Sequence, residues 1–154
     1  GVDTSNLVAS VPKLVQLMAH YDQEFEFIVQ KNDETKPLWR GILEYYEKRG
    51  GSIGIPSNVT MLVDESKGTG VLASSWPPPP EEYNIGYAGG IGPDNIRTVL
   101  GDVLAVSKGR KVWVDMESSL RTVDKKSGMD SFDLNKCFRC IEVACEIGIY
   151  EHPF

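Results

Sequence analysis

The chain begins with the hydrophobic spacing of a helix, followed by the patterns of a strand and of a second helix. Residues 6–21 are predicted to be helical, with Pro12 tolerated in the first turn, and residues 25–29 to form a strand. Thr35 is the predicted N-cap of the next helix, which ends at the glycine pair 50–51. The two apolar stripes consist of Leu7, Val11, Leu14, Val15 and Met18, and of Leu38, Ile42, Leu43 and Tyr46.

Three further runs that are mostly apolar predict strands over residues 59–63, 83–88 and 111–114. Each run is followed by polar residues, and a predicted helix through residues 97–104 separates the last two. Four strands joined by crossovers are typical of βα units in a parallel α/β sheet. Ligands bind such sheets at the carboxyl ends of the strands, which is where the polar residues fall.

The last hydrophobic pattern predicts a helix that begins after Ser131, its predicted N-cap. The segment before it is rich in Lys, Ser and Gly and is predicted to be a loop. The apolar stripe of this helix consists of Leu134, Phe138, Ile141 and Cys145, with Ala144 and Ile147 alongside.

Four consecutive prolines, Pro77 to Pro80, interrupt the alternation of strands and helices. Proline cannot continue a helix, so this crossover is predicted to be a loop with polyproline character. A proline run can also be a ligand for an aromatic groove, but no basic residue flanks this one. A stiff spacer is therefore the favoured interpretation.

The stretch from Tyr83 to Ile96 reads as strand, tight turn and helix start, with Gly89-Gly90 and Gly92-Pro93 at the turn. Such a turn can present backbone N–H groups at a helix N-terminus and so hold a phosphate without a charged side chain. It is the clearest candidate for a binding site in the chain.

Asp64 closes a largely apolar strand and precedes a loop that contains glycine. A carboxyl group that is partly desolvated at this place can work as a general acid or base. The same carboxylate can instead only cap the amides of its loop, and position alone leaves both interpretations open.

Asp115 and Glu117 end the fourth predicted strand in the same manner. Their charge is unfavourable beside a bound phosphate, so one of them is expected to turn away or to pair with Arg121. Ser118 and Ser119 can donate hydrogen bonds to a phosphate, although a solvated turn is the simpler interpretation of two adjacent serines.

Length and composition limit the choice of function. The 154 residues, 41% apolar and 25% charged, predict one globular domain over residues 1–154. A formal charge of −6 argues against nucleic-acid and anionic-membrane partners, but not against one phosphate held by backbone amides. No apolar run reaches the roughly 18 residues that span a bilayer, and no signal pattern is seen. The three cysteines do not resemble a secreted disulfide framework, so a reducing, cytoplasmic location is expected.

Cys137, Cys140 and Cys145 could be considered as metal ligands, but they lack the fourth ligand of a structural zinc site. Neither His20 nor His152 lies at a zinc-like spacing from them, so no metal or other cofactor is predicted. The cysteines are interpreted as small buried side chains that pack on the sheet.

Taken together and in order, four motifs resemble the C-terminal half of phosphoribosylanthranilate isomerase, an enzyme of tryptophan biosynthesis, and more closely its uncharacterised isomerase-like relatives. They cover about residues 59–147. The motifs are Leu-Val-Asp-Glu-Ser-Lys-Gly-Thr-Gly, Tyr-Ala-Gly-Gly-Ile-Gly-Pro-Asp-Asn-Ile, Val-Asp-Met-Glu-Ser-Ser-Leu-Arg and Phe-Asp-Leu-Asn-Lys.

The resemblance implies a ribulose-phosphate-binding (βα)8 TIM barrel of which the four strands would be the fifth to eighth. Phosphate would lie between the last two loops, and Asp64 would be the general acid that opens an aminoaldose in an Amadori rearrangement. The implied phosphate-binding residues are Gly89, Gly90, Gly92, Asn95, Ser118 and Ser119, and Gly68, Gly70, Asp115 and Arg121 are expected near the substrate. Trp76 is most simply a core or rim residue, but it is close enough in sequence to the Asp64 loop to contact an aromatic substrate.

The general base of the resembling enzyme is a cysteine on the first strand, to which no residue here corresponds. The chain also has Lys67 where that enzyme usually has Gly, and Glu117 and Ser119 where it usually has Ser and Gly. Two functions are therefore expected as alternatives: a phosphosugar isomerase, or a non-catalytic relative that serves as a binding or scaffold module. The expected partners are a phosphorylated sugar or phosphate ion, and either an N-terminal half-barrel or a second copy that covers the open sheet edges.

Overall fold

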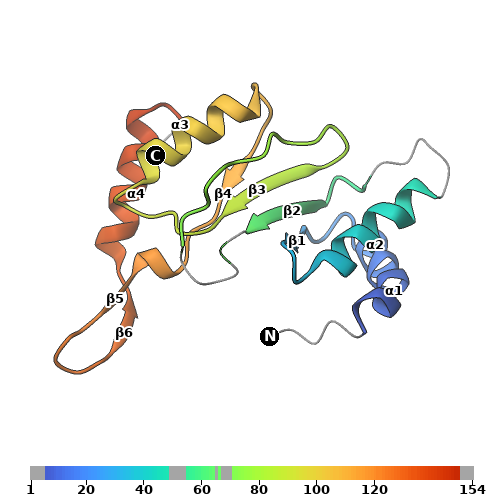
Figure 1. Cartoon of the computed structure of the whole chain (residues 1–154), viewed down its shortest axis with the longest axis horizontal. Helices are drawn as coiled ribbons and strands as arrows, with labels where there is room; N and C mark the ends of the chain where they lie inside the picture. The colour runs from blue at the N-terminus through green and yellow to red at the C-terminus, as the bar shows by residue number, and fades with distance from the viewer. Residues whose placement is uncertain (1–5, 49–54, 65, 67–70, 150–154) are drawn as a thin grey trace.

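A computed structural model describes residues 6–48, 55–64, 66 and 71–149 (Figure 1). The helices are α1 (Leu7–His20), α2 (Lys36–Glu47), α3 (Ile96–Ser107), α4 (Leu134–Glu146) and the short 3-10 helix η1 (Ser118–Leu120). The strands are β1 (Phe27–Lys31), β2 (Val59–Asp64), β3 (Asn84–Ala88), β4 (Trp113–Val114), β5 (Arg121–Val123) and β6 (Asp130–Phe132). None of the described helices is long and apolar enough to cross a membrane.

The four predicted strands form one parallel sheet in the order β1-β2-β3-β4, which confirms the α/β class with strands and helices in alternation. Val29 pairs with Met61, and Met61 with Ile85, so these three side chains lie on one face. Ile28 pairs with Thr60 on the opposite face. The helix ending predicted at residues 50–51 lies outside the described part of the chain.

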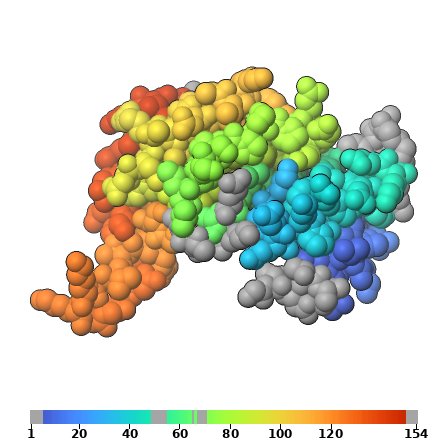
Figure 2. All heavy atoms as spheres, in the orientation of Figure 1, coloured from blue at the N-terminus to red at the C-terminus, as the bar shows by residue number. Residues whose placement is uncertain are grey.

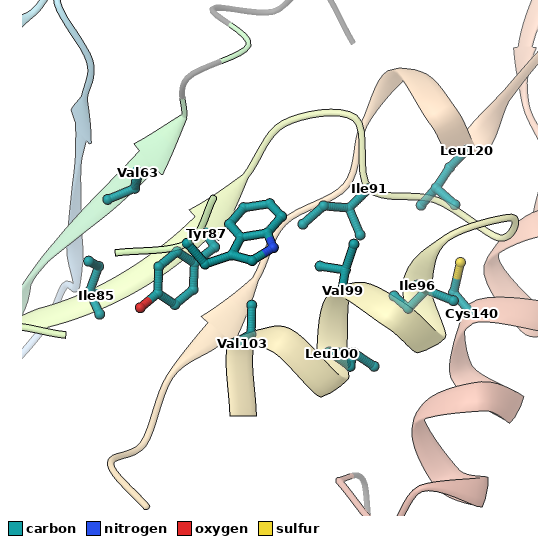
Figure 3. Packing of buried hydrophobic residues seen from close by; sticks show 11 residues of the cluster. Val63, Ile85, Tyr87, Ile91, Ile96, Val99, Leu100, Val103, Leu120 and Cys140 are labelled. Atoms are coloured by element: carbon teal, nitrogen blue, oxygen red, sulfur yellow. The ribbon is translucent and has the colours of Figure 1, made fainter. Parts of the chain in front are cut away.

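One face of the sheet is covered by all four α-helices. Val29 and Met61 are buried in a cluster with α1 and α2, and Ile85 and Tyr87 in a second cluster with α3 and α4. Figure 3 shows part of the second cluster, in which Val103 of α3 points toward Tyr87 of β3 and Val99 lies beside Ile91. Because Val29, Met61 and Ile85 share a face, all the helices lie on the same side of the sheet.

The opposite face of the sheet is not covered by a helix in the described structure. Ile28 on this face is 58% exposed, and Leu62 is half-buried. Trp113 pairs with Gly86 there, and its ring takes the space above the glycine: a Cβ on Gly86 would lie 2.3 Å from Trp113 Cε2. An aromatic ring that packs over a strand glycine restores some of the packing that glycine lacks.

The crossover from β2 to β3 contains no helix in its described part, residues 66 and 71–83. We call residues 71–83 the strap. Trp76 of the strap is buried edge-to-face against Tyr87, whose hydroxyl donates to the Pro77 carbonyl at 2.6 Å. Arg110 donates to the carbonyls of Pro79 and Pro80. The predicted loop is thus confirmed over residues 71–83, and these hydrogen bonds hold its proline segment.

Helix α4 does not bury the apolar stripe that the sequence predicts, although amphipathic helices usually bury such a stripe. Leu134 and Phe138 of the stripe are 64% and 60% exposed, and Ile141 is also exposed. The buried side of α4 is instead formed by Cys137, Cys140, Val143, Ala144 and Ile147. The predicted packing of cysteines against the core is confirmed for Cys140, whose pKa is raised by burial and secondarily by Cys137.

The prediction of Ser131 as N-cap is wrong. Asp133 caps α4, and its Oδ1 accepts from the amides of Asn135 and Lys136, while Oδ2 accepts from the Thr122 hydroxyl. The Thr122 hydrogen bond is the main reason that the pKa of Asp133 is lowered. Ser131 lies in β6, because the predicted loop contains an antiparallel hairpin of β5 and β6. Thr35 does lie at the N-cap of α2, but its hydroxyl donates to the Gln30 carbonyl at 2.6 Å and makes no cap bond.

Candidate functional site

A cavity of about 200 Å³ lies at the carboxyl ends of the parallel strands. It is bordered by Gln30 of β1, the end of β2, the turn after β3 and the segment after β4, so four chain regions far apart in sequence meet there. The lining residues are Gln30, Leu62, Asp64, Ser66, Ala88, Gly89, Gly90, Ile91, Asp115, Met116, Glu117, Ser118 and Ser119.

Asp64 is the most buried polar side chain of the cavity, with 7% of its surface exposed. Its Oδ2 accepts from the Gln30 side-chain amide at 2.7 Å, and its Oδ1 accepts from the amide and hydroxyl of Ser66 at 3.1 and 2.7 Å. The hydrogen bond from the Ser66 amide is a loop-capping interaction, which was one of the two interpretations of Asp64 that the sequence left open. The carboxyl group nevertheless lines the cavity, so it also has the position that an acid would need.

The glycine pair after β3 permits a turn that other residues would strain. Gly89 and Gly90 have φ values of +118° and +65°. A Cβ on Gly90 would lie 2.4 Å from the backbone nitrogen of Leu72, and a Cβ on Gly89 would lie 3.6 Å from Asp64 Oδ1. The turn is therefore in close contact with the backbone at Leu72, whereas beside the Asp64 carboxylate it is the positive φ of Gly89, not lack of space, that favours glycine.

Asn95 has a role inside the turn. Its Oδ1 accepts from the Gly92 amide at 2.8 Å, and its Nδ2 donates to the Gly90 carbonyl at 2.8 Å. The amides of Asn95 and Ile96 both donate to the Gly92 carbonyl. Neither Gly92 nor Asn95 borders the cavity; the Asn95 side chain closes the turn, and Gly92 packs against the Ser119 side chain.

The segment after β4 forms the opposite wall of the cavity. Ser118 and Ser119 begin η1 and line the cavity together with Glu117, the N-cap residue of that helix. A Cβ on Gly92 would lie 2.5 Å from Ser119 Cβ, so the glycine allows the two loops to approach closely. The loops after β3 and β4 are thus in contact at Gly92 and Ser119, as the family resemblance implies.

Acidic residues dominate the charge of the cavity. Asp64, Asp115 and Glu117 line it, and no Lys or Arg is among its described lining residues. Of the two alternatives expected for Asp115 and Glu117, pairing with Arg121 is not seen, because Arg121 forms an ion pair with Asp130 across the hairpin, 2.9 Å from Nε to Oδ2. Among these described lining residues, the groups that can donate hydrogen bonds to an anion are therefore uncharged.

The other predicted residues lie elsewhere. Trp76 does not line the cavity and is packed in the second core cluster against Tyr87. Gly68 and Gly70 lie outside the described residues. Among the residues that the structure describes, no three His, Cys, Asp or Glu side chains are grouped so that they could hold a metal ion.

Sequence reasoning missed Gln30 and Ser66, which hold the two oxygens of Asp64. Gln30 directly follows the predicted strand 25–29, so the rule that ligand-binding residues lie at the carboxyl ends of strands would have found it. Gln30 and Asp64 are 34 positions apart in the sequence, so their contact is evident only when β1 and β2 are paired.

The cavity offers chemistry suited to a polar ligand with several hydroxyl groups. Carboxylates at Asp64, Asp115 and Glu117 accept hydrogen bonds, while the hydroxyls of Ser118 and Ser119 both donate and accept.

No family model, curated protein or solved structure matches this chain.

Proposed function

We propose that the chain is the C-terminal half of a (βα)8 barrel, strands five to eight, which binds a phosphorylated sugar and acts as a phosphoribosylanthranilate isomerase-like enzyme. One observation carries the proposal: Asp64 and the loops after β3 and β4 line the same cavity at the carboxyl ends of the strands. The likeness of the motifs to that family supplies the assignment of the individual roles.

The arrangement of helices supports a barrel rather than a doubly wound sheet. The strands follow one another in chain order, and the α-helices of the described residues lie on one face. A doubly wound sheet has helices on both faces and a reversal of strand order. In a barrel the face without helices is the interior, where bulky residues such as Ile28, Leu62 and Trp113 fill the layers.

The edge beyond β4 supports the same proposal. A right-handed crossover would place α4 over β4 and over the next strand of the sheet. Leu134, Phe138 and Ile141 of α4 are exposed, and β4 has no neighbour on its outer side in the described structure. A following βα unit, from an N-terminal half-barrel or from a second copy, would cover both.

In the proposed reaction, the Asp64 carboxyl protonates the furanose ring oxygen of an aminoaldose while the bond from that oxygen to C1 breaks. The product is an open-chain Schiff base, and Asp64 is left as a carboxylate held by Gln30 and Ser66. A base from the other half of the barrel then removes the C2 proton, which gives an enolamine. The protonated base returns this proton to C1, and the C2 hydroxyl loses its proton as the C2 carbonyl of the aminoketose forms. That hydroxyl proton restores the Asp64 carboxyl group, directly or through water.

A non-catalytic sugar-phosphate-binding module is the second candidate. The Ser66 amide and hydroxyl both donate to Asp64, which is the geometry of a carboxylate that holds its own loop. Asp64→Asn separates the two candidates when aminoaldose turnover is measured in the assembled barrel. Loss of turnover by 100-fold or more with phosphate binding retained supports the acid, whereas unchanged turnover, or none in the parent, supports the binding module.

Phosphate binding is tested with inorganic phosphate and Glu117→Gln, because one unit charge about 4 Å away opposes an anion by roughly 1 to 4 kcal/mol. We expect amide shifts at Gly89, Gly90, Ser118 and Ser119 in NMR titrations, and binding at least about five-fold tighter in the variant. Glu142→Gln on exposed α4 makes the same charge change outside the cavity and should leave affinity unchanged within two-fold. No shifts at these amides, or equal effects of the two variants, would contradict the proposed site.

A further inference from the structure

A second depression lies on the helix-covered side of the molecule, away from the cavity described above. It is a groove of about 500 Å³ between the strap and α3, which run side by side (Figure 2). Trp76, Val99 and Val106 are among its apolar residues. The full set of lining residues is Leu72, Ala73, Ser74, Ser75, Trp76, Asp94, Asn95, Thr98, Val99, Asp102, Ala105 and Val106.

The groove exists because the β2–β3 crossover has no helix in its described part. Helices α1 and α2 pack together over one core cluster, and α3 and α4 over the other. The two clusters share no residue. A βα unit normally places a helix over such a junction, so the strap leaves a gap in the helix layer where a helix would pack.

The wall formed by α3 has the spacing of one helix face. This face begins at Thr98 and continues four, seven and eight residues later with Asp102, Ala105 and Val106. Thr98, Asp102 and Ala105 are exposed, and Asp94 lies at the start of the same wall. In the described part of the chain neither aspartate forms an ion pair, and no Lys or Arg lines the groove.

The opposite wall is held in a fixed position. Trp76 is buried, and the strap carbonyls of Pro77, Pro79 and Pro80 accept hydrogen bonds from Tyr87 and Arg110. The end of this wall at Trp76 is therefore anchored before anything enters the groove, which lowers the cost of binding. Because these carbonyls are occupied, the proline run is poorly suited to act as a peptide ligand itself.

We propose that this groove docks an amphipathic helix of a partner protein, with apolar side chains on the groove floor and basic side chains opposite Asp94 and Asp102. The described part of the crossover has no helix to fill this space, and the acidic wall selects the charge of the partner. An extended peptide is disfavoured as the occupant, because the unpaired strand edges of the parallel sheet are those of β1 and β4, not those beside the groove.

The test uses two 18-residue helical peptides of the same pattern, one of Leu and Lys and one of Leu and Glu, with the whole chain. We expect the Leu/Lys peptide to bind and to shift the amides of Ser74, Thr98 and Ala105 in NMR titrations. Asp102→Lys should weaken binding ten-fold or more, and Ala105→Trp, which fills the groove from an exposed position, should do the same.

Asp124→Lys is the matched control, since it makes the same charge change on the distant β5–β6 hairpin, and it should change affinity by less than two-fold. The proposal is overturned if the Leu/Glu peptide binds equally well. It is also overturned if neither peptide binds, if the shifts fall outside the groove, or if Asp124→Lys and Asp102→Lys weaken binding to the same degree.

Discussion

The two faces of the parallel sheet carry similar residues but have different surroundings. Ile85 on the helix-covered face is 1% exposed, whereas Ile28 on the other face is 58% exposed. Both are isoleucines in strands of the same sheet, so the difference comes from what lies above them, not from their own hydrophobicity. The covered face stabilises the described chain, and the open face can contribute as much only when another element covers it.

The largest contrast is expected between Ile85→Ala and Ile28→Ala. The first leaves a cavity in a packed core and should lower the free energy of unfolding by about 2 to 5 kcal/mol. The second should change it by about 0.5 kcal/mol or less. Urea denaturation of both variants measures the difference. Equal losses would mean that Ile28 is covered in solution, and a loss for Ile28→Ala that appears only on assembly would support completion of the barrel.

A smaller effect is expected from Gly86→Ala, which tests whether Trp113 packs on the open face. The new methyl group meets the indole ring at 2.3 Å. Overpacking of this kind should destabilise the chain by about 1 to 3 kcal/mol. A double-mutant cycle with Trp113→Ala should recover most of that loss. An additive cycle would show that the ring does not lie over Gly86.

Tyr87→Phe probes the covered face through the strap. Loss of the hydrogen bond to Pro77 should cost about 1 kcal/mol at pH 7. Burial raises the pKa of Tyr87, partly opposed by Arg110, so unfolded molecules ionise first as the pH rises. The stability due to Tyr87 is therefore complete below about pH 10 and is lost as the pH rises through the folded pKa. Thermal unfolding between pH 8 and 11 should show a shallower decline for the variant than for the parent.

The smallest effect is expected for Gln30→Ala on the open face. It removes one of the three hydrogen bonds to Asp64 and should cost about 1 kcal/mol or less, because Gln30 is exposed. Gln23→Ala, an exposed glutamine outside the cavity, serves as the control for chemical denaturation. If the two variants unfold alike, the Gln30–Asp64 bond contributes nothing measurable.

The strands were predictable because each is a short, nearly continuous apolar run that ends in polar residues. Val59 to Asp64 shows both features, and its end also located the cavity. The approach of the β3 and β4 loops was expected only through the family resemblance, which placed Gly92 and Ser119 on two phosphate loops. The contact of Gln30 with Asp64 required the register between two strands, which spacing along one strand does not contain.

The orientation of α4 could not be predicted from periodicity alone. Apolar side chains extend around more than half of this helix, so both the arc around Cys140 and the stripe around Phe138 satisfy helical spacing. Tertiary contacts decide which arc is buried. The hairpin was missed for a different reason: its strands are three residues each and entirely exposed, so they show no alternation of apolar and polar positions. In Figure 2 the hairpin stands out from the body of the molecule.

The separation of the two core clusters affects how parts of the molecule unfold locally. β2 supplies Val59 and Met61 to one cluster and Val63 to the other, so the backbone ladder between β2 and β3 is the main connection between them. Local unfolding of α1 and α2 then need not disturb α3 and α4. Amide hydrogen exchange should resolve two cooperative units with separate opening free energies, and Met61→Ala should accelerate exchange in α2 while leaving α3 protected.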